Sequence, residues 1–541
     1  MRAFLLCGVI LGTAAARLPA AEPVFTHIHP AGVQAGTTVM VTLTGKFDPW
    51  PCQIHADAAG LTFAPRKEAG IFDLTVDPAV PPGPHLLRAF NAEGASAPVA
   101  LMITREPQIL EAEPNDDFRA PQVLESSTAT VNGSLGKSDD VDSFAVNLSK
   151  GQTVVVRVEA YVLAAGFDAM LRITDAAGTT LAFNHDGPEN MDPLLVFTAP
   201  ADGKYVVQTM GHKYPAATDI RFQGGADCVY RLHLSTAPLA RHAWPLAVPA
   251  ARTGAVTVEG WNLPGSPFEF EKLPPFLFPA PSSDLPELTE NAPPQTLAVP
   301  SAVSGRIAVH GETDRYLFPA KKGEILDLSV SGPELGSEMD ARIQVLDEKG
   351  IELAVNDDAG GSSEPRLVWT APADGIFTAA VGEVTQRGGA DYYYRLALIR
   401  PLPVVTATVA GHAFKIESGG SREIKISVAF ANGFAAPLTL SAQSLPAGLS
   451  APEVTVPEKG GEVTLTLTAE KNAPPVSLPF RLVLTEKGNE NQARHPVGYR
   501  MISTTENNGV PQGYRRLLVN GTSDLWLTVT APPAPEQEKG K

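Results

Sequence analysis

Two groups of acidic side chains lie close together in one short stretch of the chain, between residues 111 and 142. The first group opens the stretch with Glu111, Glu113, Asp116 and Asp117, among which lies the amide Asn115, and the second group closes it with Asp139, Asp140 and Asp142. If the fold brings the two groups together, their like charges repel one another, and a hard cation with oxygen ligands would neutralise them. The residue types therefore indicate a calcium site.

The elements that must position these groups are short β-strands. Valine, threonine, leucine and phenylalanine alternate with polar residues in runs such as VVVRVEA (154–160), REIKISVAF (422–430) and GEVTLTLTAE (461–470). A period of two, bounded by Gly, Pro, Asn and Asp, is typical of antiparallel strands, and no long helical pattern interrupts it. The sequence therefore predicts an all-β protein built of antiparallel β-sandwiches in series.

An internal repeat organises the middle of the chain. FDAMLRITDAAG around Asp168 aligns with MDARIQVLDEKG around Asp340 at an offset of 172 residues. FTAPADGKY and WTAPADGIF, which begin at 197 and 369, keep that offset. GGADCVYRL and GGADYYYRL, which begin at 224 and 388, have an offset of 164, so the second copy lacks eight residues of one loop. Two copies of one β domain are predicted.

These motifs in this order resemble the bacterial pre-peptidase C-terminal (PPC) domain, over residues 108–236 and 286–399. The resemblance implies a jelly-roll-like β-sandwich, and the first copy is similar to the collagen-binding domains of collagenases, which bind a pair of calcium ions. The positions that match the calcium ligands of those relatives are Glu111, Glu113, Asn115, Asp116, Ser134, Asp139 and Asp142. Five carboxylates suit two divalent ions better than one.

The alternative for this stretch is an acidic linker followed by Asx-type turns. At the offset of 172, Arg306 and Gly311 replace Ser134 and Asp139 in the second copy and only Asp314 is retained, so the second copy is not expected to bind calcium there. The loops 184–186 and 356–358, Asn-His-Asp and Asn-Asp-Asp, could hold a further cation, but a turn that satisfies its own backbone is the favoured interpretation. His27 and His29 could clip a metal, yet two ligands make no site without others.

The remaining segments indicate further domains and export. The predicted boundaries are a signal peptide at 1–21, an IPT/TIG-like immunoglobulin-like domain at 22–105, a Pro-rich linker or partial immunoglobulin-like domain at 237–285, an immunoglobulin-like sandwich at 402–531 and a disordered tail at 532–541. Arg2, the apolar run 4–10 and a small-residue cleavage site carry the signal-peptide prediction, and Cys7 makes a lipoprotein the weaker alternative. No later stretch is apolar enough for a transmembrane helix, so the mature chain is expected to be secreted, periplasmic or on the cell surface.

Charge and cysteine content exclude several function classes. The formal net charge is −17, and it becomes −19 once Arg2 and Arg17 leave with the signal peptide. No basic patch is present to neutralise phosphates, so nucleic acid is not expected as a partner. Cys52 and Cys228 fall in different predicted domains, so a disulfide framework is not expected.

The sequence carries no recognisable catalytic motif: H-E-x-x-H, G-x-S-x-G and a Cys-His signature are all absent. We therefore expect a non-catalytic binding or scaffolding protein with an extracellular protein or polysaccharide as its ligand. The alternatives are an accessory or targeting component of a secreted peptidase system, and a structural cell-surface protein. Trp50, Trp261, the stretch from Pro267 and the run 392–394, of which at least one tyrosine should reach solvent, could contact a ligand; we favour a role in covering seams between domains.

Overall fold

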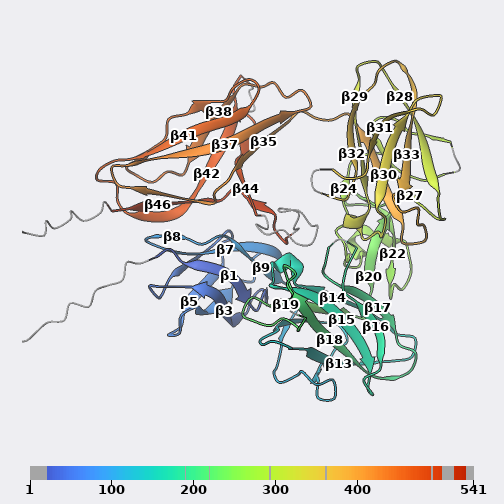
Figure 1. Cartoon of the computed structure of the whole chain (residues 1–541), viewed down its shortest axis with the longest axis horizontal. Coiled ribbons are helices and arrows are strands. Elements are labelled where there is room, and N and C mark those ends of the chain that lie inside the picture. The colour runs from blue at the N-terminus through green and yellow to red at the C-terminus, as the bar shows by residue number, and fades with distance from the viewer. Residues whose placement is uncertain are drawn as a thin grey trace, which may run out of the picture.

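The structure of the protein is a computed structural model that describes residues 21–188, 190–218, 220–291, 294–359, 362–488, 492–501 and 517–531. Within these ranges the chain forms β-sheets, and its only helices are the 3-10 turns Tyr161–Leu163, Phe270–Lys272 and Pro333–Leu335. None of the helices in these ranges could cross a membrane. The predicted all-β fold of serial sandwiches is confirmed (Figure 1). Most of the predicted signal peptide and the predicted tail lie outside the described residues.

The N-terminal sandwich comprises two sheets around one apolar core. One sheet has the order β1 (Val24–His29), β3 (Thr38–Lys46), β6 (Ile71–Val76), β5 (Leu61–Pro65), and the other has the order β2 (Gly32–Gln34), β9 (Val99–Thr104), β7 (Gly83–Asn91), β4 (Gln53–Ala56), with β8 (Gly94–Ala95) paired to β7. Trp50 packs edge-on against Phe72 at 5.0 Å between ring centroids, so this half-buried tryptophan packs against the core.

The next domain follows the N-terminal sandwich directly and contains the acidic stretch. We call it the first sandwich, because a domain with the same strand order, the second sandwich, follows later in the chain. Its sheets are β10 (Gln108–Leu110), β12 (Ala129–Ser134), β19 (Val229–Ser235), β14 (Thr153–Glu159), β17 (Leu194–Thr198), and β11 (Gln122–Val123), β13 (Asp142–Leu148), β18 (Gly203–Lys213), β15 (Phe167–Asp175), β16 (Thr180–Asn184). In β14, Val154, Val156 and Val158 enter the core, as the period-two pattern predicts. Arg157 and Glu159 therefore lie on the outer face of their sheet.

The second sandwich has the same strand order in both of its sheets. The sheets are β25 (Glu287–Thr289), β27 (Ser301–Arg306), β34 (Tyr393–Ile399), β29 (Ile325–Ser331), β32 (Arg366–Thr370), and β26 (Gln295–Thr296), β28 (Thr313–Ala320), β33 (Gly375–Glu383), β30 (Ala341–Leu346), β31 (Glu352–Asn356). Each strand thus has a counterpart in the first sandwich, in the same place and in the same order along the chain.

A small bridging module joins the two sandwiches. It consists of β20 (Leu239–Trp244), β22 (Ala255–Trp261) and β23 (Phe268–Glu269), together with β21 (Val248–Pro249) paired to β24 (Ser282–Ser283). This module corrects one expectation: Tyr392, Tyr393 and Tyr394 are all buried. Tyr393 lies on the outer face but is covered by His242 of β20, 4.1 Å between ring centroids, and its hydroxyl donates to Leu335 O.

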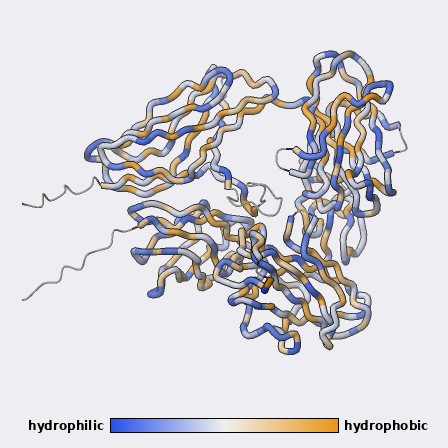
Figure 2. Tube along the Cα trace, in the orientation of Figure 1, coloured by the Kyte–Doolittle hydropathy of each residue, from blue (hydrophilic) through white to orange (hydrophobic). Residues whose placement is uncertain are grey.

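The C-terminal sandwich contains the last two large sheets. They are β39 (Leu449–Ser450), β41 (Gly461–Ala469), β37 (Ser421–Ala431), β35 (Val404–Val409), β44 (Gly498–Arg500), β45 (Gly521–Thr522), and β36 (Ala413–Glu417), β46 (Leu525–Thr530), β42 (Val476–Glu486), β38 (Leu438–Gln443), β40 (Val454–Thr455), with β43 (Arg494–Pro496) paired to β42. Figure 2 shows hydrophobic and hydrophilic residues alternating along many of these strands.

The C-terminal sandwich lies beside the N-terminal sandwich, although the rest of the chain separates them in sequence (Figure 1). The contact centres on Trp526, which is 1 % exposed and packs on Phe90 at 4.9 Å between ring centroids. The buried Arg88 side chain donates to Asp524 O at 2.9 Å and to His412 Nδ1 at 3.0 Å. Because Arg88 can only donate, His412 Nδ1 accepts and carries no proton.

Candidate metal centre

Two loops at one end of the first sandwich bring the acidic residues together. The first loop follows β10, and at the start of this loop Glu111 N donates to Asn132 O of β12. The second loop connects β12 to β13 and ends at Asp142, the first residue of β13. Because β10 and β12 are parallel neighbours, both loops leave the sheet at the same edge. The two acidic groups, 20 or more residues apart in sequence, thereby become neighbours.

Four carboxylates form a compact cluster there. Glu113, Asp116, Asp140 and Asp142 each offer one oxygen, and these atoms all lie within 4.8 Å of one another. Asp140 and Asp142 are fully buried, whereas Glu113 and Asp116 are exposed at the mouth of the cluster. Such a set of hard oxygen donors matches the ligands that calcium takes in proteins.

The other predicted ligands lie around this cluster in different roles. Asn115 is 1 % exposed and its amide donates to Glu111 Oε1 at 3.2 Å. Glu111 Oε2 accepts from the backbone nitrogen of Ser134 at 2.7 Å, so Glu111 braces the two loops. Asp139 is exposed; its backbone N donates to Phe222 O at 3.0 Å, and its carboxylate accepts from Phe222 N at 3.3 Å. Asp140, which the motif comparison passed over, takes the place expected for Asp139.

Several buried oxygens of the cluster lack hydrogen-bond donors. Among the described residues, Asn115 Oδ1, Asp140 Oδ1 and Asp142 Oδ1 are inaccessible to solvent and accept no hydrogen bond. Lys137 Nζ is 2.7 Å from Asp116 Oδ2 but 3.7 Å from Asp140 Oδ1, beyond hydrogen-bonding distance. Leaving a buried acceptor without a partner costs about 1 to 3 kcal/mol, and more for a charged group. The arrangement therefore favours an additional positive centre.

The electrostatics of the cluster point the same way. Burial and the neighbouring Glu111 raise the pKa of Asp142 to about 10, although Tyr230 donates to its carboxylate. Burial and Asp116 raise the pKa of Asp140 to about 6. The neighbouring Asp140 carboxyl and the contact with Lys137 lower the pKa of Asp116. Burial first, and then the repulsion between neighbouring carboxylates, thus favour a protonated form of this cluster when no cation is bound.

Close backbone approach holds the second loop in place. A Cβ at Gly224 would lie 1.8 Å from Lys137 O, so only glycine allows this segment to pack against the loop that carries Asp140. A Cβ at Gly133 would lie 2.3 Å from the Tyr230 ring, whose hydroxyl donates to Asp142 Oδ2 at 2.7 Å. Gly133 and Gly224 therefore have a packing role.

The second sandwich reproduces part of this arrangement. Tyr394 donates to Asp314 Oδ2 at 2.7 Å, as Tyr230 does to Asp142. Glu290 Oε2 accepts from Arg306 N, and Glu312 Oε2 accepts from Ala308 N and Val309 N, which are the roles of Glu111 and Asp140 in the first sandwich. At the offset of 172, Glu312 aligns with Asp140, which is not among the predicted ligands, whereas Glu290 lies outside that alignment. Between Glu290 and Gln295 the sequence NAPP carries no carboxylate, so counterparts of Glu113 and Asp116 are absent.

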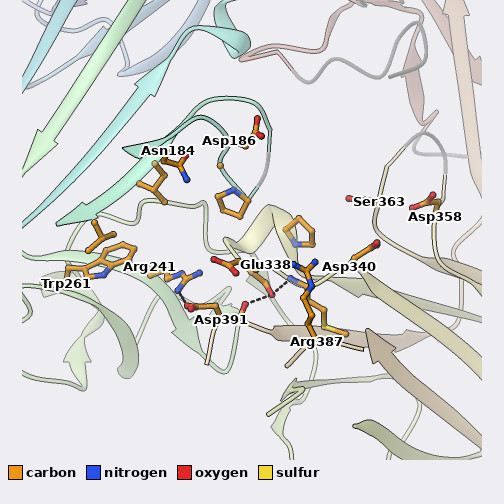
Figure 3. A pocket seen from close by; sticks show the side chains of 17 residues that line it. Asn184, Asp186, Arg241, Trp261, Glu338, Asp340, Asp358, Ser363, Arg387 and Asp391 are labelled. Atoms are coloured by element: carbon orange, nitrogen blue, oxygen red, sulfur yellow. Dashed lines mark hydrogen bonds and ion pairs between the residues drawn. The ribbon is translucent and has the colours of Figure 1, made fainter. Parts of the chain in front are cut away.

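The loops 184–186 and 356–358 lie on opposite sides of a cavity of about 850 Å³ between the two sandwiches and the bridging module (Figure 3). Asn356 donates to Asp358 O at 2.7 Å and accepts from Arg366 N at 2.9 Å, as expected for a turn that satisfies its own backbone. Arg241 forms an ion pair with Asp391 beside Trp261 in the same cavity. Phe278 belongs to the aromatic stretch that begins at Pro267, and it fills the space beside Gly336. This stretch therefore lies at a seam between modules.

His27 and His29 contact the first sandwich and do not converge on a common site. His27 Nε2 is 3.0 Å from Ala164 O. Burial lowers the pKa of His29, and a backbone contact with Gly133 acts in the opposite direction. Gly32 N also donates to Asn132 Oδ1 across this boundary at 2.8 Å. The two histidines of β1 thus help to join the N-terminal sandwich to the first sandwich.

Comparison with known proteins identifies one family over part of the chain. Residues 140–208 match the model of the bacterial pre-peptidase C-terminal domain. A probable subtilase-type serine protease of Deinococcus radiodurans is 32 % identical over 98 residues, which are 18 % of this chain and 13 % of that protein. The match therefore spans a small part of that relative.

Solved structures give low global similarity. The pre-peptidase C-terminal domain of a collagenase from Bacillus anthracis is 18 % identical, covers 21 % of this chain and 99 % of its own length, and has a TM-score of 0.16. Tripeptidyl peptidase 2 is 12 % identical, covers 96 % of this chain and 39 % of its own, and has a TM-score of 0.17.

Proposed function

We propose that the protein is an exported, non-catalytic binding or scaffolding protein in which calcium orders the first sandwich and the segment that enters it. The buried oxygens of Asn115, Asp140 and Asp142, which accept no hydrogen bond from the described residues, carry this proposal. Glu113 and Asp116 complete the set of oxygen ligands from the exposed side. A cation held between the two loops would tie the start of the first sandwich to its core.

The proposed domain organisation follows the boundaries expected from the sequence. The shared strand order and the matching Tyr–Asp hydrogen bonds support two copies of one PPC-like domain, at 108–236 and 286–399. The second copy has Glu290 and Glu312 in the roles of Glu111 and Asp140, but it lacks the exposed pair that corresponds to Glu113 and Asp116. We therefore keep calcium to the first copy, where the four carboxylates suit one ion and Glu111 and Asn115 extend the set toward a second.

Thermal unfolding of the mature chain, with calcium or with a chelator, tests the metal site. Binding to the folded state alone stabilises it by about 2.7 kcal/mol at a calcium concentration of 100 times Kd. Asp142→Asn should abolish this gain, while it changes the calcium-free protein little, because Asp142 already holds a proton there at pH 7. Asp314→Asn is the matched control in the second sandwich and should keep the full calcium response. An equal response from both variants contradicts the site.

Calorimetry completes this test by counting the ions. Two ions per chain would support the pair implied by the collagenase relatives, and one ion would restrict the site to the four-carboxylate cluster. The absence of any calcium heat in the unaltered chain would reduce the stretch 111–142 to an acidic linker. Protein hydrolysis that remains with the chain through successive purification steps would contradict the non-catalytic role.

A second candidate function is an accessory or targeting role in a secreted peptidase system. The match of residues 140–208 to the pre-peptidase C-terminal domain and the partial similarity to a probable serine protease favour it. Retention of the mature chain on a peptidase from the same cells, with calcium present and not with a chelator, would support this role. Retention on whole cells or on a polysaccharide would instead favour the binding and scaffolding role.

A further inference from the structure

One cation of the chain itself lies beside the cluster of four carboxylates, the side chain of Lys137. Its Nζ lies 2.7 Å from Asp116 Oδ2 and 3.7 Å from Asp140 Oδ1, and the latter is one of the buried oxygens that accept no hydrogen bond. No other lysine, arginine or histidine in the described ranges forms an ion pair with the four carboxylates. Lys137 thus supplies the one positive charge that touches the cluster.

The Lys137 side chain can leave the cluster while the backbone stays in place. This side chain is 59 % exposed, and its close partner Asp116 is exposed as well. The backbone is held separately, because Gly136 N and Lys137 N both donate to Asp140 Oδ2. Lys137 O packs tightly against Gly224. The ammonium on its flexible stem is therefore a tethered cation that can exchange with a dissolved one.

The second sandwich has the same loop backbone without the lysine. At the offset of 172, Val309 replaces Lys137, and it is 63 % exposed. Val309 N donates to Glu312 Oε2. Lys137 N donates to Asp140 Oδ2 in the same way. The loop thus forms without a lysine side chain, and the lysine occurs only in the copy that also has the exposed carboxylates at the mouth of the cluster.

The charge balance distinguishes between the cations that could replace this ammonium. A sodium or potassium ion that displaces it exchanges one positive charge for another, so the attraction to the carboxylates does not increase. A calcium ion brings two charges to the same oxygens, so it is attracted more strongly than the ammonium. Because the ammonium is tethered, it competes at a high effective concentration that dissolved monovalent ions do not match.

We propose that Lys137 is a specificity-determining residue of the calcium site, whose ammonium excludes monovalent ions and sets the calcium concentration at which the site fills. This inference rests on the proposed function, since it requires that calcium binds at the four carboxylates. Removal of the Lys137 charge should have two effects, which are tighter calcium binding and a new response to sodium.

Calcium titration of the mature chain and of Lys137→Gln by isothermal calorimetry tests the competition. The variant should bind calcium about three to five times more tightly, because calcium no longer has to break an exposed ion pair. Lys150→Gln is the matched control, since Lys150 is an exposed lysine beyond the other end of β13, and its calcium Kd should equal that of the unaltered chain. An equal Kd for Lys137→Gln and the unaltered chain, or weaker binding by this variant, would overturn the proposal.

Thermal unfolding in the presence of a chelator tests the selectivity without calcium. At equal ionic strength, Lys137→Gln should have a higher unfolding midpoint in sodium chloride than in choline chloride, because sodium now enters the cluster and the larger choline does not. The unaltered chain and Lys137→Arg, which keeps the positive charge, should each have the same midpoint in both salts. Identical midpoints for Lys137→Gln in the two salts would refute the exclusion of monovalent ions.

The two assays separate a failure of this inference from a failure of the calcium site. Calcium binding with the same Kd in the unaltered chain and in Lys137→Gln contradicts the role of Lys137 alone. The absence of calcium binding in all of these proteins contradicts the calcium site, and the role of Lys137 falls with it.

Discussion

Lowering the pH should weaken the contact between the two ends of the chain, and His412 should be the group responsible. His412 Nδ1 accepts a hydrogen bond from Arg88, which remains a cation at neutral pH even though burial lowers its pKa to about 10. Burial and this guanidinium lower the pKa of His412 from 6.5 to about 4. Protonation of His412 would place two cations in contact. Tyr499 packs edge-on against this imidazole at 5.3 Å between ring centroids, and it carries no charge at acid pH.

The magnitude follows from the difference between the folded and unfolded pKa values. The unfolded chain takes up a proton at His412 as the pH falls through 6.5, whereas the folded chain resists until about pH 4. Stability is therefore unaffected above pH 6.5 and decreases from pH 6.5 down to about pH 4. Between pH 8 and pH 5, only the interval from pH 6.5 to pH 5 contributes. At about 1.36 kcal/mol per pH unit, the free energy of unfolding would fall by about 2 kcal/mol over this interval. Since His412 is only half-buried, hydration should reduce this to about 1 kcal/mol.

Urea unfolding of the mature chain at pH 8 and pH 5, followed by tryptophan fluorescence, measures this effect. Trp526→Phe removes a tryptophan of the C-terminal sandwich. The part of the fluorescence change that this variant loses therefore reports the unfolding of that sandwich. His412→Gln keeps an acceptor for Arg88 but cannot titrate, so its stability relative to the unaltered chain should improve by about 1 kcal/mol on going from pH 8 to pH 5. His310→Gln, at an exposed histidine, is the control and should show no such change. An identical pH dependence in His412→Gln and the unaltered chain would refute the reasoning.

Three other predictions concern packing and hydrogen bonding. Trp526→Ala should destabilise the C-terminal sandwich by about 3 to 5 kcal/mol in urea unfolding, because a fully buried aromatic is lost from the contact with Phe90; a loss below about 1 kcal/mol would mean that the contact contributes little. Tyr230→Phe and Tyr394→Phe each remove a hydrogen bond to a buried carboxylate, so each should lower the free energy of unfolding by about 1 to 3 kcal/mol in thermal unfolding. Only Tyr230→Phe should change the stabilisation by calcium. A change in both variants would argue against a site confined to the first sandwich. Gly224→Ala should destabilise the first sandwich clearly more than Gly203→Ala. A Cβ at Gly224 would meet Lys137 O at 1.8 Å, whereas a Cβ at Gly203 would meet nothing within 4 Å. Equal unfolding midpoints of the two variants would contradict the packing role of Gly224.

Much of the fold could be predicted because strand patterns are local. The alternation in residues 154–160 depends only on which neighbours face the core, and β14 places Val154, Val156 and Val158 there as expected. The repeat around Asp168 and Asp340 likewise predicted equivalent strands, and β15 and β30 occupy the same position in their sheets. The calcium assignment, the domain boundaries and the ligand remain predictions.

The details of the candidate metal centre depended on the path of two loops. Sequence motifs favoured Asp139, yet its backbone adopts a left-handed φ of 64° and its side chain turns to Phe222, while Asp140 enters the cluster. Glu290 was missed because the second copy reaches the position of Glu111 with different spacing. Glu312 aligns with Asp140 at the offset of 172, and it was missed because Asp140 was not among the predicted ligands. Which carboxylate reaches a site depends on backbone angles in irregular segments, and no periodic pattern encodes them.

The sequence by itself determined the all-β class, the repeat and the stretch in which acidic residues gather, because hydrophobic alternation and turn residues act over a few positions. Only the tertiary structure decided which surfaces are covered. Tyr393 is buried because a separate module lies over its sheet, and Trp526 is buried because the N-terminal sandwich packs against the C-terminal sandwich. Such features depend on contacts between residues far apart in sequence, and their geometry is set only when the modules pack.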